Sequence, residues 1–121
     1  MINRSAFVTA LVAGTVLQLA MIVTGHFSVW VAMNLFMFGG LGISAIAGAL
    51  YARQAGGGFA GAALGGALTG GLCALIGIAA SFALGDVPAA VLIFGTVGST
   101  VAGAMGGVIG QAAFGSRTAM T

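Results

Sequence analysis

Residues 57–84 read GGFAGAALGGALTGGLCALIGIAASFAL, a stretch without a charged side chain. A helix needs about 20 consecutive, mostly apolar residues to cross the hydrocarbon core of a membrane, and this stretch is longer than that. The strands of a membrane barrel would require apolar and polar residues to alternate, and the stretch has no such alternation. It therefore predicts a transmembrane α-helix.

Three further apolar stretches flank this one, and each ends at residues that interrupt a membrane helix. They cover residues 5–24, 28–51 and 88–114, with breaks at Gly25-His26, Arg53-Gln54 and Gly85-Asp86-Val87-Pro88. The chain has 121 residues, of which 60% are hydrophobic and 3% charged, whereas a soluble domain carries about 25% charged residues. We therefore expect an all-α, polytopic membrane protein with a single membrane domain. Its four transmembrane helices would form a tightly packed, glycine-rich bundle of two hairpins, followed by a tail at residues 115–121.

The few charged residues predict the orientation. Arg4, Arg53 and Arg117 fall on the N-terminal segment, the central loop and the C-terminal tail, which four spans place on one side. His26 and Asp86 fall on the two remaining loops. Because basic residues concentrate on the cytoplasmic side, we expect both termini in the cytoplasm and a bacterial-type inner membrane. The alternative is a cleaved signal peptide in the first span, although its apolar stretch is longer than usual and no A-x-A site follows.

Small residues recur at every fourth position of the expected helices. The clearest rows are Gly57, Gly61, Gly65, Thr69, Cys73, Gly77 and Ser81 on the third helix, Gly95, Ser99, Gly103 and Gly107 on the fourth, and Gly40, Ser44 and Gly48 on the second. Membrane helices associate through close contacts that small residues permit, so we expect these residues to pack helices together. The third and fourth helices each carry a second row of small residues, which is more contact surface than one neighbouring helix would use. These second rows predict contact with a second copy or another subunit.

The second and fourth expected helices also resemble each other. A shift of 55 residues aligns Gly40 with Gly95, Ser44 with Ser99, and residues 47–49 with 102–104. One interpretation is a duplicated helical hairpin, and the other is chance similarity between two sequences of biased composition.

The small numbers of basic, acidic, histidine and cysteine residues exclude several classes of function. Three dispersed arginines form no basic patch for nucleic acid. Residues 56–61 match GxGxxG, but they open a membrane helix rather than follow a strand, and the chain has no lysine for a phosphate loop. One acidic residue, one histidine and one cysteine supply neither paired carboxylates nor a metal site within one chain. We therefore expect no enzyme, no metal and no cofactor, with bound lipid or pigment left open.

Four polar residues are expected near the membrane midplane: Gln18, Asn34, Thr69 and Ser99. Gln18 lies about 20 Å along the first helix and Asn34 about 9 Å into the second, so the two amides would lie at about the same height. Such groups hold helices together by hydrogen bonds. The alternative is a binding site for a neutral solute or a dehydrated ion.

Residues at the helix ends have two interpretations each. We expect Asp86 to cap the helix that begins near Pro88, with an ion or proton site as the alternative. His26 is expected to be an interfacial polar residue, and the alternative is an axial ligand of haem or chlorin. Trp30 and Tyr51 are expected as interfacial anchors.

In size and number of helices the chain resembles the small multidrug-resistance exporters and the small fluoride channels. The first helix lacks the carboxylate that the exporters use, and residues 61–80 carry Gly and Ala where the channels have a Phe-, Thr- and Ser-rich motif. Residues 45–71, AIAGALYARQAGGGFAGAALGGALTGG, resemble a group of uncharacterised small four-helix prokaryotic membrane proteins. That resemblance implies the fold and no particular activity.

Two functions follow as expectations. The first is a non-enzymatic accessory or scaffold subunit of a larger membrane complex, or a self-assembling structural unit, with lipid and other membrane subunits or itself as partners. The second is a homo-oligomeric channel or facilitator for a small neutral solute or ion, constricted at the level of Gln18 and Asn34.

Overall fold

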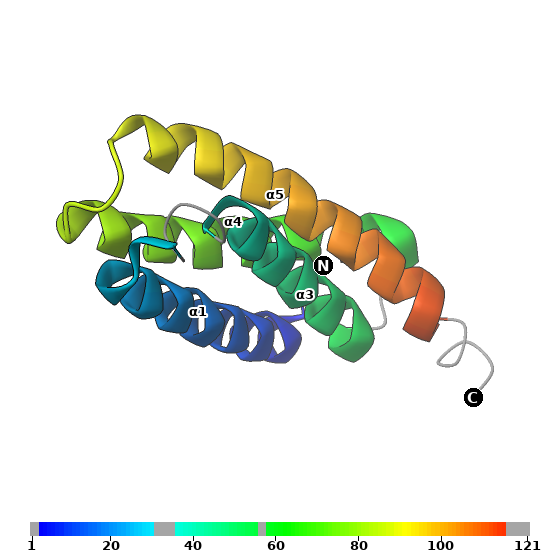
Figure 1. Cartoon of the computed structure of the whole chain (residues 1–121). Helices are drawn as coiled ribbons and strands as arrows, with labels where there is room; N and C mark the ends of the chain where they lie inside the picture. The colour runs from blue at the N-terminus through cyan, green and yellow to red at the C-terminus, as the bar shows by residue number, and fades with distance from the viewer. Residues whose placement is uncertain (1–2, 31–35, 56–57, 116–121) are drawn as a thin grey trace.

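The computed structural model describes residues 3–30, 36–55 and 58–115, and its regular elements are all helical. They are α1 (Arg4–Phe27), α3 (Phe36–Ala55), α4 (Gly58–Ala83) and α5 (Ala90–Gly110), which continues as a π-helical turn, η1 (Gln111–Gly115) (Figure 1). The prediction of an all-helical chain is confirmed. Three segments, Arg4–Phe27, Gly58–Ala83 and Ala89–Phe114, are long and apolar enough to cross a membrane. Asn34, Gly57 and Arg117, which the sequence analysis singled out, lie outside the described residues.

The four helices form a bundle in which α3 and α4 lie at the centre. Each of these two contacts the other three helices, whereas no contact between α1 and α5 is found in the described part of the chain. Helices α3 and α5 run in one direction, and α1 and α4 run in the opposite one (Figure 1). The two outer helices, α1 and α5, are therefore separated across the bundle.

Helix α1 begins at a capping residue and continues past the glycine that was expected to end it. The Asn3 side chain accepts a hydrogen bond from the backbone N–H of Ala6 at 3.0 Å, as N-cap residues do. The helix continues through Gly25 and ends at Phe27, three residues later than the expected end at residue 24. A single glycine in a helix costs only about 1 kcal/mol, and here it does not break α1.

The end of α4 corrects one prediction. Gly85 adopts a φ of +79°, and the N–H groups of Gly85 and Asp86 donate to the carbonyls of Phe82 (3.0 Å) and Ser81 (2.9 Å). This is the Schellman arrangement that ends a helix at a left-handed glycine. The expectation that Asp86 caps the next helix is wrong: the N-cap of α5 is Ala89, which makes no side-chain cap bond.

Backbones of three helices meet at Gly48 of α3, Gly66 of α4 and Gly103 of α5. A Cβ atom added to Gly48 or Gly66 would collide with the carbonyl oxygen of Gly103, and one added to Gly103 would collide with that of Gly66. Only a hydrogen atom fits in these contacts, so the helices approach as closely as their backbones allow.

The second small row of α5 comprises Gly98, Ala102, Gly106 and Gly110, and its glycines face α3. A Cβ atom at Gly106 would lie 2.7 Å from the Cα of Ala45, and one at Gly110 would lie 2.8 Å from the Cα of Ala49. The two small rows of α5 therefore both contact helices of the same chain. In contrast, a Cβ atom added to Gly61 of α4 meets nothing within 4 Å.

We call the part of the bundle where α3 ends the Tyr51 end. Tyr51 is 1% exposed, its ring lies against Gly65, and its hydroxyl accepts a hydrogen bond from the backbone N–H of Asn3 at 3.0 Å. The expectation of an interfacial anchor is wrong for Tyr51, because the absent side chain of Gly65 makes room for the ring inside the bundle. Nearby, the Arg53 guanidinium lies 5.5 Å from the centroid of the Phe114 ring in η1, a cation–π distance.

Candidate functional site

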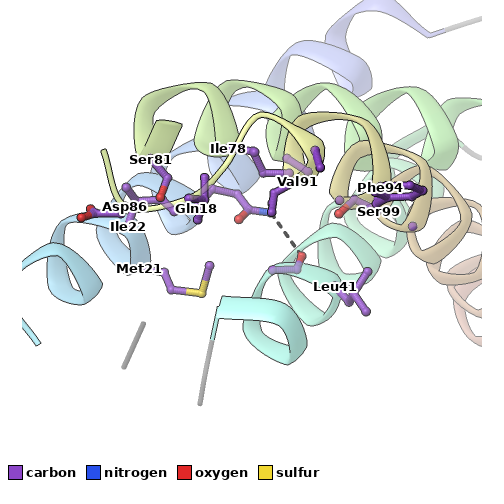
Figure 2. Close-up of a pocket in the computed structure, with 16 residues that line it drawn as sticks. Gln18, Met21, Ile22, Leu41, Ile78, Ser81, Asp86, Val91, Phe94 and Ser99 are labelled. Atoms are coloured by element: carbon purple, nitrogen blue, oxygen red, sulfur yellow. Dashed lines mark hydrogen bonds between the residues drawn. The ribbon is translucent and has the colours of Figure 1, made fainter. Parts of the chain in front are cut away.

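The opposite half of the bundle, which we call the Asp86 end, contains a cavity of about 610 Å³. Side chains from all four helices line it, including Met21 from α1, Leu41 from α3, Ile78 from α4 and Phe94 from α5 (Figure 2). Cavities that bind small molecules have volumes of about 300–1,000 Å³ and mostly apolar walls with a few polar groups. The size and lining of this cavity fit that description.

Gln18 is the main polar group of the cavity. Its side chain is 2% exposed, and its Nε2 donates to the carbonyl of Gly40 at 3.2 Å and to the hydroxyl of Ser44 at 3.3 Å. Figure 2 shows the amide reaching from α1 to α3, with the bond to Gly40 dashed. The Sγ of Cys73 in α4 lies 4.0 Å from the same nitrogen. This amide therefore links α1 to the two central helices.

Ser81 is the second polar group, and it has no partner. The residue is 1% exposed and lines the cavity, and its Oγ makes no hydrogen bond within the described part of the chain. Hydroxyls in helices commonly bond to a carbonyl one turn earlier, as Thr69 does with Gly65 at 3.0 Å and Thr100 with Thr96 at 2.8 Å. A buried hydroxyl without a partner costs about 1–3 kcal/mol, so a ligand that bonds to it would recover this free energy.

The structure brings together part of the expected midplane set. Gln18 and Ser99 line the same cavity, and Ser99 is 3% exposed. Thr69 is buried but bonded within α4, and it is not among the described residues that line the cavity. Asn34, the expected partner of Gln18, lies outside the described residues.

Two residues of this site were missed from the sequence. The sequence places Ser44 and Ser81 in rows of small packing residues, but both are buried hydroxyls. The Ser44 hydroxyl bonds to the Gln18 amide, and Ser81 lies in the cavity wall. The available signal was their polarity in stretches that are otherwise apolar. The spacing of four residues obscured it, because serine also fits a row of small residues.

His26 and Asp86 lie at the end of the cavity. The Nδ1 of His26 and the Oδ2 of Asp86 are 2.8 Å apart, and this contact joins the last turn of α1 to the loop between α4 and α5. Their side chains are 35% and 21% exposed, and Asp86 also lines the cavity. The His26 ring packs edge-on against Phe27, with centroids 5.1 Å apart.

This pairing bears on the axial-ligand hypothesis for His26. A metal-bound histidine commonly directs its other ring nitrogen to a carboxylate, and Asp86 occupies that position. Among the described residues, no group of three or more His, Cys, Asp and Glu side chains is placed to hold a metal ion. The pair also joins α1 to the α4–α5 loop, which gives it a structural role.

The glycines among the expected packing residues have four kinds of surroundings. Gly48, Gly103 and Gly107 contact the backbone of neighbouring helices. Gly40 and Gly95 line the cavity. Gly65 and Gly77 adjoin side chains, those of Tyr51 and Gln18, and Gly61 adjoins open space.

The comparisons with known proteins returned no relative. No family model matches the chain, and no similar curated protein or solved structure was found.

Proposed function

We propose that the protein is a non-enzymatic facilitator that takes up a small uncharged molecule in the cavity at the Asp86 end. The observation that carries this proposal is the cavity of about 610 Å³ with the buried Gln18 amide in its wall. Asp86 is the one charged residue among the described residues that line it, and its carboxylate is paired with His26. The cavity therefore suits an uncharged molecule better than an ion.

The proposal includes four membrane spans, with α3 belonging to the second. The bond between Asn3 and Tyr51 keeps the start of α1 beside the end of α3, so Arg4 and Arg53 share one end of the bundle. The pair of His26 and Asp86 lies at the other end. This distribution supports cytoplasmic termini in a bacterial-type inner membrane.

The close contacts of Gly48, Gly66 and Gly103 suggest how passage would be controlled. They leave no space between α3, α4 and α5 on the side of the cavity toward the Tyr51 end. A molecule in the cavity would cross to the cytoplasm only when α5 separates from its two neighbours. The described conformation would then be a state closed on the cytoplasmic side.

A second candidate function is an accessory or scaffold subunit. It is favoured by the space beside Gly61, which is flanked on α4 by the exposed side chains of Phe59 and Leu64. A small residue next to exposed apolar side chains suits close contact with another membrane helix. Native mass spectrometry of gently extracted protein tests this function, because Gly61→Leu should then abolish a fixed-ratio assembly.

Flux into liposomes tests the facilitator. Purified protein is reconstituted, and glycerol entry is followed by light scattering after rapid mixing. Gly98→Leu should abolish the flux, because Gly98 lines the cavity and its nearest neighbour, the Cδ2 of Leu41, is 3.5 Å from an added Cβ. Gly42→Leu is the matched control, because a Cβ there meets nothing within 4 Å. Wild-type vesicles no more permeable than empty ones to glycerol or to short-chain alcohols would contradict the proposal.

A further inference from the structure

The two sides of the cavity differ in polarity, and this difference identifies a class of ligand. The polar groups of Gln18 and Ser81 come from neighbouring helices, α1 and α4, which contact each other. The wall formed by α5 and α3 contains Val91, Phe94 and Leu41, with the Ser99 hydroxyl farther along α5. A molecule beside Ser81 would therefore meet the hydrogen-bonding groups of Ser81 and Gln18 on one side and a mostly hydrocarbon surface on the other.

We infer that the cavity binds an uncharged amphiphile with one small hydrogen-bonding head, a hydroxyl or carbonyl group, which bonds to Ser81 beside Gln18 while its hydrocarbon body lies against α5. The inference rests on the proposed role of the cavity as the binding site, and it names the class of molecule.

The Ser81 hydroxyl supplies the observation that points to a ligand. It is 1% exposed, it lines the cavity, and it is unpaired within the described part of the chain. A hydroxyl both donates and accepts a hydrogen bond, so a hydroxyl or carbonyl head satisfies it once the Ser81 side chain rotates toward the cavity, because its Oγ is covered in the described conformation. The Nε2 of Gln18 is already engaged by Gly40 and Ser44, which leaves the acceptor Oε1 as the second contact for a donating head.

Two other classes of ligand fit less well. A sugar would place several hydroxyls against Val91, Phe94 and Leu41, where they find no partner, and an unpaired polar group in an apolar site is unfavourable. An anionic amphiphile such as a fatty acid would bring its charge near the Asp86 carboxylate, and like charges repel. A neutral head avoids both problems.

The test uses dodecanol with a diazirine on its tail, bound to the protein in lipid nanodiscs. After illumination, the labelled positions are read by mass spectrometry, and unlabelled dodecanol and dodecanoate are added as competitors. We expect labelling within residues 91–99 of α5, displaced by dodecanol and at least tenfold less well by dodecanoate. Labelling spread over the outer surface, or equal competition by the two compounds, would overturn the inference.

Variants distinguish the contribution of the Ser81 hydrogen bond to dodecanol binding from the contribution of the volume of the cavity. Ser81→Ala should weaken dodecanol binding about tenfold, the effect of losing one hydrogen bond, while Gly98→Leu should remove binding and Gly42→Leu should not change it. Unchanged affinity in Ser81→Ala would overturn the assignment of the head to Ser81. Glycerol flux that Gly98→Leu abolishes, without dodecanol binding, would overturn this inference and leave the proposed function in place. Dodecanol bound in the cavity without flux of either glycerol or alcohols would contradict the proposed function and leave this inference in place.

Discussion

Small residues recur at similar spacing at both ends of the bundle, but the helices are in backbone contact at one end and line a cavity at the other. At the Tyr51 end, Gly48, Gly66 and Gly103 bring three backbones into contact. At the Asp86 end, Gly95 and Gly98 continue the small rows of α5, yet they line a cavity of about 610 Å³.

The residues across from the glycines explain the difference. A Cβ atom at Gly103 would meet backbone atoms of α4, whereas one at Gly95 would first meet the Cδ1 of Ile78 at 2.6 Å. The Ile78 side chain therefore stands between the backbones of α4 and α5 at the Asp86 end. Small residues on one helix permit close approach, but the approach occurs only where the facing row is small too.

The largest expected effect is on stability at the Tyr51 end. Gly103→Ala should lower the free energy of unfolding by about 3 kcal/mol, the upper part of the usual range for overpacking, because the new methyl group meets the Gly66 backbone. Gly95→Ala should cost less than about 1 kcal/mol, because the end of the Ile78 side chain can rotate away. Unfolding in mixed micelles by titration with a denaturing detergent measures both.

Gly42→Ala is the control for this comparison, because the added methyl group meets nothing within 4 Å. Equal losses for the Gly103 and Gly95 variants would mean that both ends are packed alike, which would contradict the comparison.

The sequence predicted the all-helical fold and two of its helices closely, because long apolar stretches are a strong local signal. Apolar stretches and glycine breaks located α1 and α4 within three residues at each end. The expected end of the second helix at residue 51 is wrong, because α3 continues to Ala55 through residues that favour helix, and the expected helix 88–114 is α5 at Ala90–Gly110 followed by η1. The sequence could not predict the cavity, because a cavity depends on which side chains face each other across helices. The bond from Gln18 to Ser44 could not be predicted for the same reason, because the spacing of a small polar residue does not show whether its side chain faces a partner on another helix.

The next effect concerns the buried ring of the Tyr51 end. Tyr51→Phe keeps the ring beside Gly65 and removes the hydroxyl that accepts from Asn3. One hydrogen bond of this kind contributes about 1 kcal/mol, and we expect that loss in the same unfolding titration, with no change in glycerol flux. A Tyr51→Phe variant as stable as wild type would show that the contact between α1 and α3 at this end does not depend on the hydroxyl.

A loss of similar size is expected at the cavity wall. Gln18→Met retains an unbranched side chain and removes the amide, while Ser44 still donates to the Gly70 carbonyl at 3.2 Å. Interhelical hydrogen bonds in membranes contribute about 0.6 kcal/mol each on average, so losing the bonds to Gly40 and Ser44 should cost about 1 kcal/mol, and the variant should fold and lose flux. Lost assembly with a loss of several kcal/mol would instead mean that Gln18 serves mainly to hold the helices together.

The smallest effect is expected for the contact that joins α1 to the α4–α5 loop. His26 and Asp86 are partly exposed, and exposed pairs contribute about 0.2–1 kcal/mol. A double-mutant cycle of His26→Ala and Asp86→Asn should therefore give a coupling energy of about 0.5 kcal/mol. If the pair also limits access to the cavity, each single variant should raise the rate of diazirine-dodecanol labelling without changing its final extent. A coupling energy near zero with unchanged labelling rates would restrict the pair to a passive contact, and the difference between the two ends would then come from Ile78 and its neighbours alone.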